Sequence, residues 1–126
     1  MSREKLPTGK PIVGRKPARD ALPPEKRLGV GVVGLHEGRT LLVALRETGY
    51  ARAVAGCDLS EEKLAEAREV APDIFLTKNY DELLARRDVQ IVAIYTPDAL
   101  HAPQIEAAFR AGNHVICTKP LINDLS

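Results

Sequence analysis

Cys57 and Cys117 are the only cysteines among the 126 residues, too few for a disulfide scaffold or a four-ligand zinc site. No apolar run approaches the ~18 residues of a membrane span, so no membrane partner is expected. Residues 1–27 lack the apolar core of a signal peptide, which favours a soluble, cytoplasmic protein. Neither sign of charge predominates, since 18 Lys and Arg against 17 Asp and Glu leave a net charge of +1. Composition therefore gives no reason to expect a nucleic-acid partner.

The chain has enough hydrophobic residues, 44%, for the core of one globular domain. Its first 27 residues stand apart, because they carry eight Lys and Arg against three acids, a net charge of +5, and five of the nine prolines. Such a segment buries too little apolar surface to offset the entropy lost on ordering. We interpret residues 1–27 as an extended arm and residues 28–126 as the domain. The arm is either a solvated tail or a segment that crosses a neighbouring subunit or an anionic ligand.

From Leu28 onward, apolar runs alternate with amphipathic stretches. The expected strands are residues 28–33, 51–57, 74–76, 89–96 and 114–118, and the expected helices are residues 39–48, 60–70, 80–86 and 99–111. Continuous apolar strands separated by helices require right-handed crossovers and a parallel sheet covered on both faces. The pattern predicts a Rossmann-like, doubly wound α/β fold of three layers with strand order 3-2-1-4-5.

A glycine pattern of the dinucleotide-binding type begins at Gly29 and ends at Gly34. The loop of such a motif must follow a strand and open a helix, so that amide groups face the phosphates. Residues 22–28 hold two prolines and three charges and make a poor buried strand, so Gly29 and Gly31 belong to the first strand region. The loop is therefore residues 34–38, and the alternative is a plain turn that binds nothing.

This loop departs from the usual pattern at three positions. His36 stands where a second glycine normally lets the backbone approach the pyrophosphate, and Glu37 adds a negative charge nearby. Gly38 comes one residue before the usual third glycine. The predicted cofactor-binding residues of the loop are Gly34, Leu35, His36, Glu37 and Gly38.

Asp58 ends the second expected strand, 24 residues after Gly34. An acid at this place can accept hydrogen bonds from an adenosine ribose diol, and it repels a 2′-phosphate. NAD rather than NADP is therefore the expected cofactor. In the competing interpretation, Asp58 and Glu61 only form a capping box for the next helix.

Cys57 and Cys117 end the second and fifth expected strands, which lie roughly 14 Å apart in the predicted sheet order. A disulfide spans at most about 7 Å between Cα atoms, so both thiols should be free. His36, His101 and Cys117 lack the spacing of metal ligands, and no metal site is expected.

Several segments between residues 28 and 120 together resemble the N-terminal domain of the Gfo/Idh/MocA oxidoreductases. The matching segments are residues 32–34 (VVG), 58–60 (DLS), 80–84 (YDELL), 96–101 (TPDALH), 111–115 (AGNHV) and 118–120 (TKP). Residues 96–101 are similar to the family's T-P-N-x-x-H, and residues 118–120 to its E-K-P. Because these segments match in register over about 90 residues, the resemblance is specific.

The resemblance implies roles for residues near the carboxyl ends of the strands. Lys119 corresponds to the lysine that lies beside the nicotinamide and contacts the substrate hydroxyl, so it is the expected catalytic residue and a cofactor contact. Thr96, Pro97, Asp98 and His101 are the other expected cofactor-binding residues, although a histidine at a helix start more often caps or packs. Thr118 replaces the family's glutamate and Asp98 its asparagine.

Family members continue into a second domain that carries the substrate pocket, so we expect such a domain beyond residue 126. The expected function is NAD(P)-dependent hydride transfer between nicotinamide and a hydroxyl of a sugar, cyclitol or related polyol, with a homo-oligomer as the full-length state. By itself this chain should bind dinucleotide and turn over little. The alternative is a non-catalytic dinucleotide-binding or sensing module. A site for a nucleoside methyl donor would fit Asp58 but leaves residues 118–120 unexplained.

Overall fold

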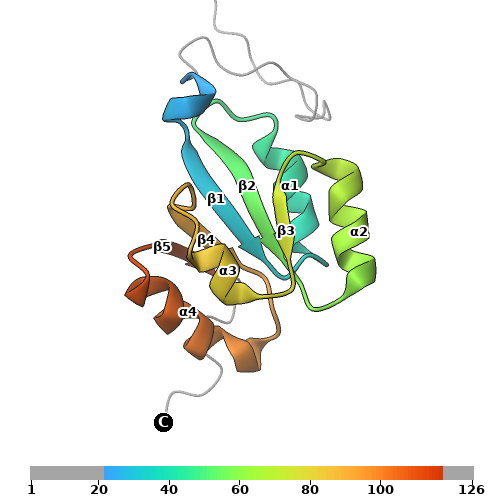
Figure 1. Cartoon of the computed structure of the whole chain (residues 1–126), viewed down its shortest axis with the longest axis vertical. Coiled ribbons are helices and arrows are strands. Elements are labelled where there is room, and N and C mark those ends of the chain that lie inside the picture. Colours follow the sequence, from blue (N-terminus) through green and yellow to red (C-terminus); the bar gives the residue numbers. More distant parts are fainter. Residues whose placement is uncertain (1–21, 118–126) are drawn as a thin grey trace, which may run out of the picture.

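The computed structural model describes residues 22–117, and the predicted alternation of strands and helices is confirmed there (Figure 1). The strands are β1 (Leu28–Val33), β2 (Ala51–Cys57), β3 (Phe75–Thr77), β4 (Ile91–Ile94) and β5 (His114–Cys117). The helices are α1 (Gly38–Leu45), α2 (Glu61–Val70), α3 (Tyr80–Leu84) and α4 (His101–Arg110), with 3-10 turns η1 (Pro24–Lys26) and η2 (Asp98–Leu100). Residues 1–21 of the predicted arm and residues 118–126 lie outside the described part.

The five strands form one parallel sheet in the order β3-β2-β1-β4-β5, as predicted. The chain builds outward from β1 on one side and then returns to place β4 on the other side. The carboxyl ends of β1 and β4 are therefore followed by connections that leave in opposite directions. In open α/β sheets this switch point is where ligands bind.

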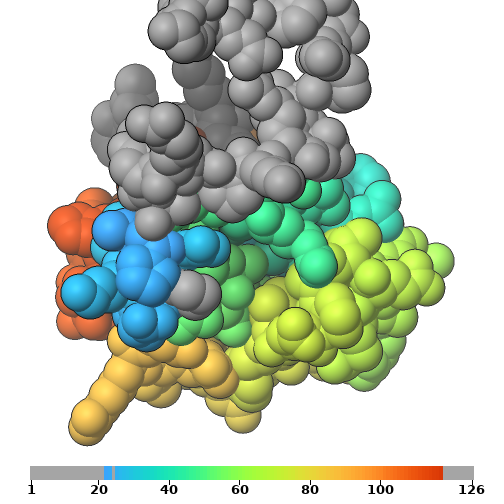
Figure 2. Space-filling model, turned by 90° about the horizontal axis from the view of Figure 1, so that it is seen from above, coloured from blue at the N-terminus to red at the C-terminus, as the bar shows by residue number. Residues whose placement is uncertain are grey.

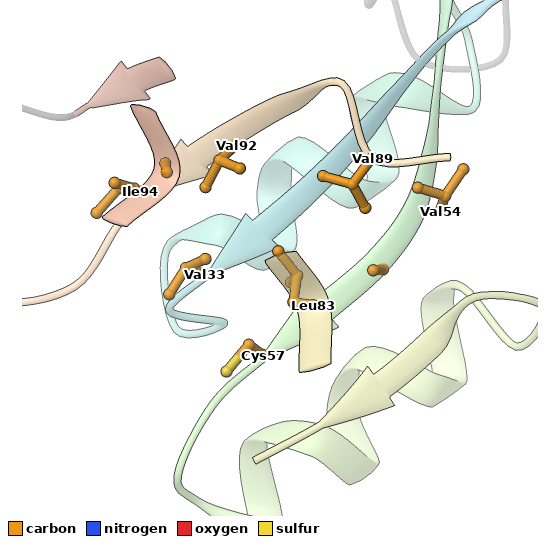
Figure 3. Packing of buried hydrophobic residues seen from close by; sticks show 9 residues of the cluster. Val33, Val54, Cys57, Leu83, Val89, Val92 and Ile94 are labelled. Carbon is orange, nitrogen blue, oxygen red and sulfur yellow. The ribbon is translucent and has the colours of Figure 1, made fainter. Parts of the chain in front are cut away.

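Two apolar layers hold the helices on the sheet, with α1 and α2 on one face and α3 and α4 on the other (Figure 1). The layer under α3 and α4 includes Val33, Val92 and Ile94 from the strands and Leu83 from α3, as Figure 3 shows. Seen from above Figure 1, the blue segment that begins the described residues lies between the red and the green parts of the chain (Figure 2). The switch point lies at the opposite end of the strands.

Some element boundaries differ from the sequence prediction. Residues 22–27, assigned above to the arm, are joined to the domain where the Leu22 amide donates to the Gly49 carbonyl at 2.8 Å. The helix expected to run to residue 48 ends at Leu45, because Arg46 and Glu47 donate to carbonyls only three residues back and tighten the last turn. The strand expected at 89–96 is limited to β4, residues 91–94.

Within residues 22–117, no helix is long and apolar enough to cross a membrane. No group of three or more metal-binding side chains gathers anywhere in that range. Cys57 and Cys117 end β2 and β5, and within the described residues neither forms a disulfide.

Candidate cofactor-binding site

Gly34 begins the loop after β1 in a backbone conformation that only glycine adopts without strain, with φ of +89°. Its amide donates to the carbonyl of Cys57 at 2.9 Å, which ties the loop to the end of β2. A Cβ atom here would lie 2.7 Å from the carbonyl carbon of Tyr95, just after β4. The loop is thus pinned between two neighbouring strands, and this position requires a glycine.

Gly38 is the first residue of α1 and lets this helix approach the sheet. A Cβ atom on Gly38 would lie 2.6 Å from Cγ1 of Val32. Gly38 therefore provides the close helix-to-strand contact expected of the third glycine, although it comes one residue early. No side chain caps the start of α1 at Glu37, and the side chains of His36 and Glu37 are exposed. The N–H groups of the first turn are suitably placed for an anion.

Asp58 accepts backbone hydrogen bonds with both carboxylate oxygens, one from the loop after β1 and one from the residue that caps α2. Oδ2 accepts a hydrogen bond from the Leu35 amide at 2.8 Å, and Oδ1 accepts one from the Ser60 amide at 2.8 Å. The cap of α2 is Ser60, whose hydroxyl accepts from the Lys63 amide, so the alternative capping box of Asp58 with Glu61 does not form. A carboxylate has about four acceptor positions, so these two hydrogen bonds leave acceptor capacity on Asp58 for a ribose diol.

A cleft of about 470 Å³ opens at the carboxyl ends of β1 to β4. Its lining includes five of the predicted site residues, namely Gly34, His36, Asp58, Thr96 and Pro97. The other lining residues are Val33, Cys57, Leu59, Lys78, Tyr80, Tyr95, Leu100 and Gln104. The size and largely apolar walls are typical of a small-molecule site.

Five other predicted residues do not line this cleft, namely Leu35, Glu37, Gly38, Asp98 and His101. The side chain of Leu35 is fully buried, and its amide is taken by Asp58. Glu37 and Gly38 lie at the start of α1, and Asp98 lies in η2. Lys119, the expected catalytic residue, lies outside the described residues.

His101 is the fifth of these residues and is completely buried at the start of α4. Its Nε2 lies 2.7 Å from the Thr96 carbonyl oxygen. The Thr96 hydroxyl is hydrogen-bonded to the side-chain oxygen of Gln104, and the Tyr80 hydroxyl donates to the Gln104 carbonyl at 2.8 Å. These contacts join α3, α4 and the loop after β4, so His101 supports the cleft from behind its wall.

Two titratable groups in the cleft wall are held neutral at ordinary pH. Burial, together with the charge of Asp58, raises the pKa of the Cys57 thiol to about 11. Burial likewise raises the pKa of Tyr80 to about 12. Because a thiol reacts as the thiolate, Cys57 is a poor nucleophile here. The described part of the cleft is therefore better suited to binding than to covalent chemistry.

The sequence analysis missed the cleft residues that follow β3 or lie on the helices beyond it. Lys78 and Tyr80 follow β3, and Gln104 comes from α4, a segment that meets them only in the folded structure. A usable signal existed for Lys78, since it directly follows β3 and the carboxyl ends of parallel strands share one edge.

Comparison with known proteins decides the family. A sequence model described as "Oxidoreductase family, NAD-binding Rossmann fold" matches residues 28–126. The chain belongs to the Gfo/Idh/MocA oxidoreductase family. Its nucleotide-binding Rossmann fold and its NAD-binding character are confirmed by this match.

Individual relatives agree with the family assignment. A dTDP-3,4-didehydro-2,6-dideoxy-alpha-D-glucose 3-reductase from Streptomyces violaceoruber is 40% identical over 98 residues, which cover 76% of this chain and 28% of the relative. An inositol 2-dehydrogenase from Agrobacterium fabrum is 34% identical over 96 residues, covering 75% of this chain and 27% of the relative.

Solved structures show the same arrangement. A scyllo-inositol dehydrogenase from Lactobacillus casei, solved with NAD(H) and scyllo-inositol, has a TM-score of 0.70 and 27% identity, over 79% of this chain and 30% of that one. A 3-ketoreductase from Actinomadura kijaniata, solved with TDP-benzene and NADP, has a TM-score of 0.70 and 30% identity, over 78% of this chain and 32% of that one. This chain spans less than a third of the length of the curated relatives described above.

The described residues fit a dinucleotide. Gly34 has no Cβ atom, which at this position would clash with the loop after β4. The start of α1, which no side chain caps, follows in the same loop. Asp58 stands at the end of β2 with acceptor capacity to spare. Together these features offer a phosphate site and an adjoining ribose site at the switch point.

Proposed function

We propose that the protein carrying this chain is an NAD-dependent oxidoreductase acting on the hydroxyl of a sugar, cyclitol or related polyol. The observation that carries the proposal is the cleft at the switch point, with Gly34 and Asp58 in the places that a dinucleotide requires. The family match supports the chemistry, and the relatives named above act on inositols and on a nucleotide-linked sugar.

Each part of the described site has a role in this proposal. The first-turn amides of α1 bind the diphosphate, with His36 beside them on the cleft lining. Asp58 accepts hydrogen bonds from the adenosine ribose, and Thr96 and Pro97 form the wall beyond β4. NAD, when bound, supplies the hydride acceptor. Leu35, Glu37, Gly38, Asp98 and His101 act by shaping the loops around it.

Lys119 is proposed as the catalytic residue on the family resemblance, since it follows β5 by two residues in the sequence. In this role its ammonium group contacts the substrate hydroxyl and polarises the oxygen as a carbonyl forms. The substrate pocket and the partners of the lysine are assigned to a second domain, consistent with the greater length of the relatives.

The wider organisation of the protein is also part of the proposal. Residues 1–27 form the arm, whose end is hydrogen-bonded to the domain from Leu22 onward, and residues 28–126 form the nucleotide-binding domain. A homo-oligomer is the full-length state, and the location is cytoplasmic. A non-catalytic dinucleotide-binding module remains the competing function, since the described cleft accounts for binding alone.

The test is hydride transfer by the full-length protein. Purified protein is incubated with NAD and a panel of inositols, aldoses and nucleotide-linked sugars, and NADH formation is followed by absorbance. The proposal predicts turnover with at least one member, with kcat reduced about a hundredfold or more by Lys119→Ala. If the protein binds NAD but turns over no member of the panel, and Lys119→Ala leaves the NAD affinity unchanged, the binding module is favoured instead.

A further inference from the structure

Lys78 stands at the mouth of the cleft, directly after β3 and across from the end of β2. It lines the cleft together with Asp58 and Leu59. Its Nζ atom lies 2.7 Å from Oε2 of Glu61, in the first turn of α2. About half of the Lys78 side chain is exposed at this edge of the cleft.

The ion pair with Glu61 is one that a stronger anion can replace. The Glu61 side chain is 78% exposed, and exposed ion pairs of this kind contribute little to stability because solvent screens them. A phosphate dianion carries more charge and more acceptor oxygens than a single carboxylate, so its bonds to an ammonium group are stronger. Lys78 can therefore exchange Glu61 for a phosphate that arrives in the cleft.

The acid that would repel such a phosphate is partly compensated. Both oxygens of Asp58 accept backbone N–H groups, from Leu35 and Ser60, at 2.8 Å each. These donors draw part of the carboxylate charge toward the loop and α2. A phosphate on the adenosine ribose would thus lie between the Asp58 carboxylate, which two amides partly neutralise, at the end of β2 and the Lys78 ammonium group at the end of β3.

We infer that Lys78 binds the 2′-phosphate of an adenosine ribose, so that this cleft accepts NADP as well as NAD. The inference rests on the proposed function, because it requires a nucleotide whose ribose lies at Asp58. The cation for the 2′-phosphate comes from the end of β3, and the residues after Asp58 offer no cation until Lys63, which pairs with Glu66 and does not line the cleft.

The experiment compares two small nucleotides that differ only in the 2′-phosphate. The 126-residue chain is titrated calorimetrically with 5′-AMP and with adenosine 2′,5′-bisphosphate, and then with NAD and NADP. Lys78→Met keeps the length of the side chain and removes the charge. We expect this variant to bind the bisphosphate and NADP about tenfold more weakly, while the affinities for 5′-AMP and NAD change less than about twofold.

Two further variants sharpen the comparison. Lys63→Met, the matched control on α2, should leave all four affinities within about twofold of the parent, because Lys63 does not line the cleft. Glu61→Gln removes the competing anion and should strengthen bisphosphate and NADP binding by about threefold without changing 5′-AMP. Circular dichroism confirms that each variant is folded.

The outcomes separate the two proposals. If Lys78→Met weakens all four ligands equally, or weakens none, Lys78 does not read the 2′-phosphate and this inference is wrong while the cleft still binds nucleotide. If the parent chain binds neither 5′-AMP nor NAD, the proposed function itself fails, and the inference fails with it.

Discussion

At the residue scale, Gly34 links the backbone of the loop to two strands at once. Its φ of +89° costs an alanine about 1–2 kcal/mol, and the added Cβ would press on the Tyr95 carbonyl as well. We predict that Gly34→Ala lowers the free energy of unfolding by about 2–4 kcal/mol and abolishes NAD binding. Urea unfolding and calorimetry measure the two effects.

Gly112 provides the matched control. It has a similar φ of +88°, but it lies in the turn before β5 and nothing stands within 4 Å of an added Cβ. Gly112→Ala should therefore cost only the backbone contribution of about 1–2 kcal/mol and leave NAD affinity unchanged. Equal effects of the two substitutions on NAD binding would contradict the placement of the loop.

Asp88 and Arg86 form the ion pair whose effect on stability depends on pH. Arg86 donates from Nε and Nη2 to the two Asp88 oxygens at 3.0 and 2.8 Å, and these bonds hold the pKa of Asp88 below its ordinary value of 3.8. A carboxyl whose pKa is lower in the folded state stabilises the fold above its unfolded pKa, and this contribution is lost as pH falls through the folded value.

The resulting prediction concerns Asp88→Asn. The variant should be slightly less stable than the parent at pH 7, by an amount kept small because both side chains are about one third exposed. The difference should shrink below about pH 4, where the parent's carboxyl begins to take up its proton. Urea unfolding at several pH values measures this, and a constant difference down to about pH 2 would refute the assignment.

At the scale of elements, α3 is too short to be stable by itself and depends on its contact with the sheet. Leu83 is its one fully buried residue and lies in the apolar layer with Val33 and Val54 (Figure 3). Leu83→Ala should therefore cost about 2–5 kcal/mol of unfolding free energy.

The same unfolding measurement on Leu59→Ala gives the comparison. Leu59 is 79% exposed, so its truncation should change stability by less than about 0.5 kcal/mol. A cost below about 1 kcal/mol for Leu83→Ala would mean that α3 is held to the sheet by something other than this side chain.

The sequence predicted the presence and order of the strands more accurately than the residues at which they end. Largely apolar runs identified β1 and β2 at their observed bounds, because a strand covered on both faces is mostly apolar. The run at 89–96 overshot β4, since Val89 bonds back to the Arg86 carbonyl in a turn, and periodicity cannot register that bond. The end of α1 depends on the tight last turn at Arg46 and Glu47, which the residue types alone do not predict.

At the scale of the site, local motifs identified Gly34 and Asp58, whose roles depend on the strand that each one follows. They did not identify Gln104 as a cleft residue, because it reaches Tyr80 and Thr96 only through the packing of α4. His101 was found by motif, but its burial behind Thr96 depends on packing that a motif does not contain.

At the scale of the whole molecule, the order of the strands brings the residues of the cleft together at one edge of the sheet. Loops from β1, β2, β3 and β4 all contribute to one cleft, although their residues span positions 33 to 104. The family match extends over the whole domain, while the chain covers less than a third of its longer relatives. The described structure therefore supports the proposed nucleotide binding, while the proposed catalysis rests on Lys119 and on the second domain proposed above.

The central claim is that the cleft at the switch point binds NAD through the loop and Asp58. Calorimetric titration of the chain with NAD tests it, beside Asp58→Ala and the control Asp73→Ala, an exposed acid that does not line the cleft. We predict a Kd below about 1 mM for the parent and the control, and at least about tenfold weaker binding for Asp58→Ala, which loses both the ribose acceptor and the brace to Leu35. Undiminished binding in Asp58→Ala, or no binding by the parent, would contradict the account.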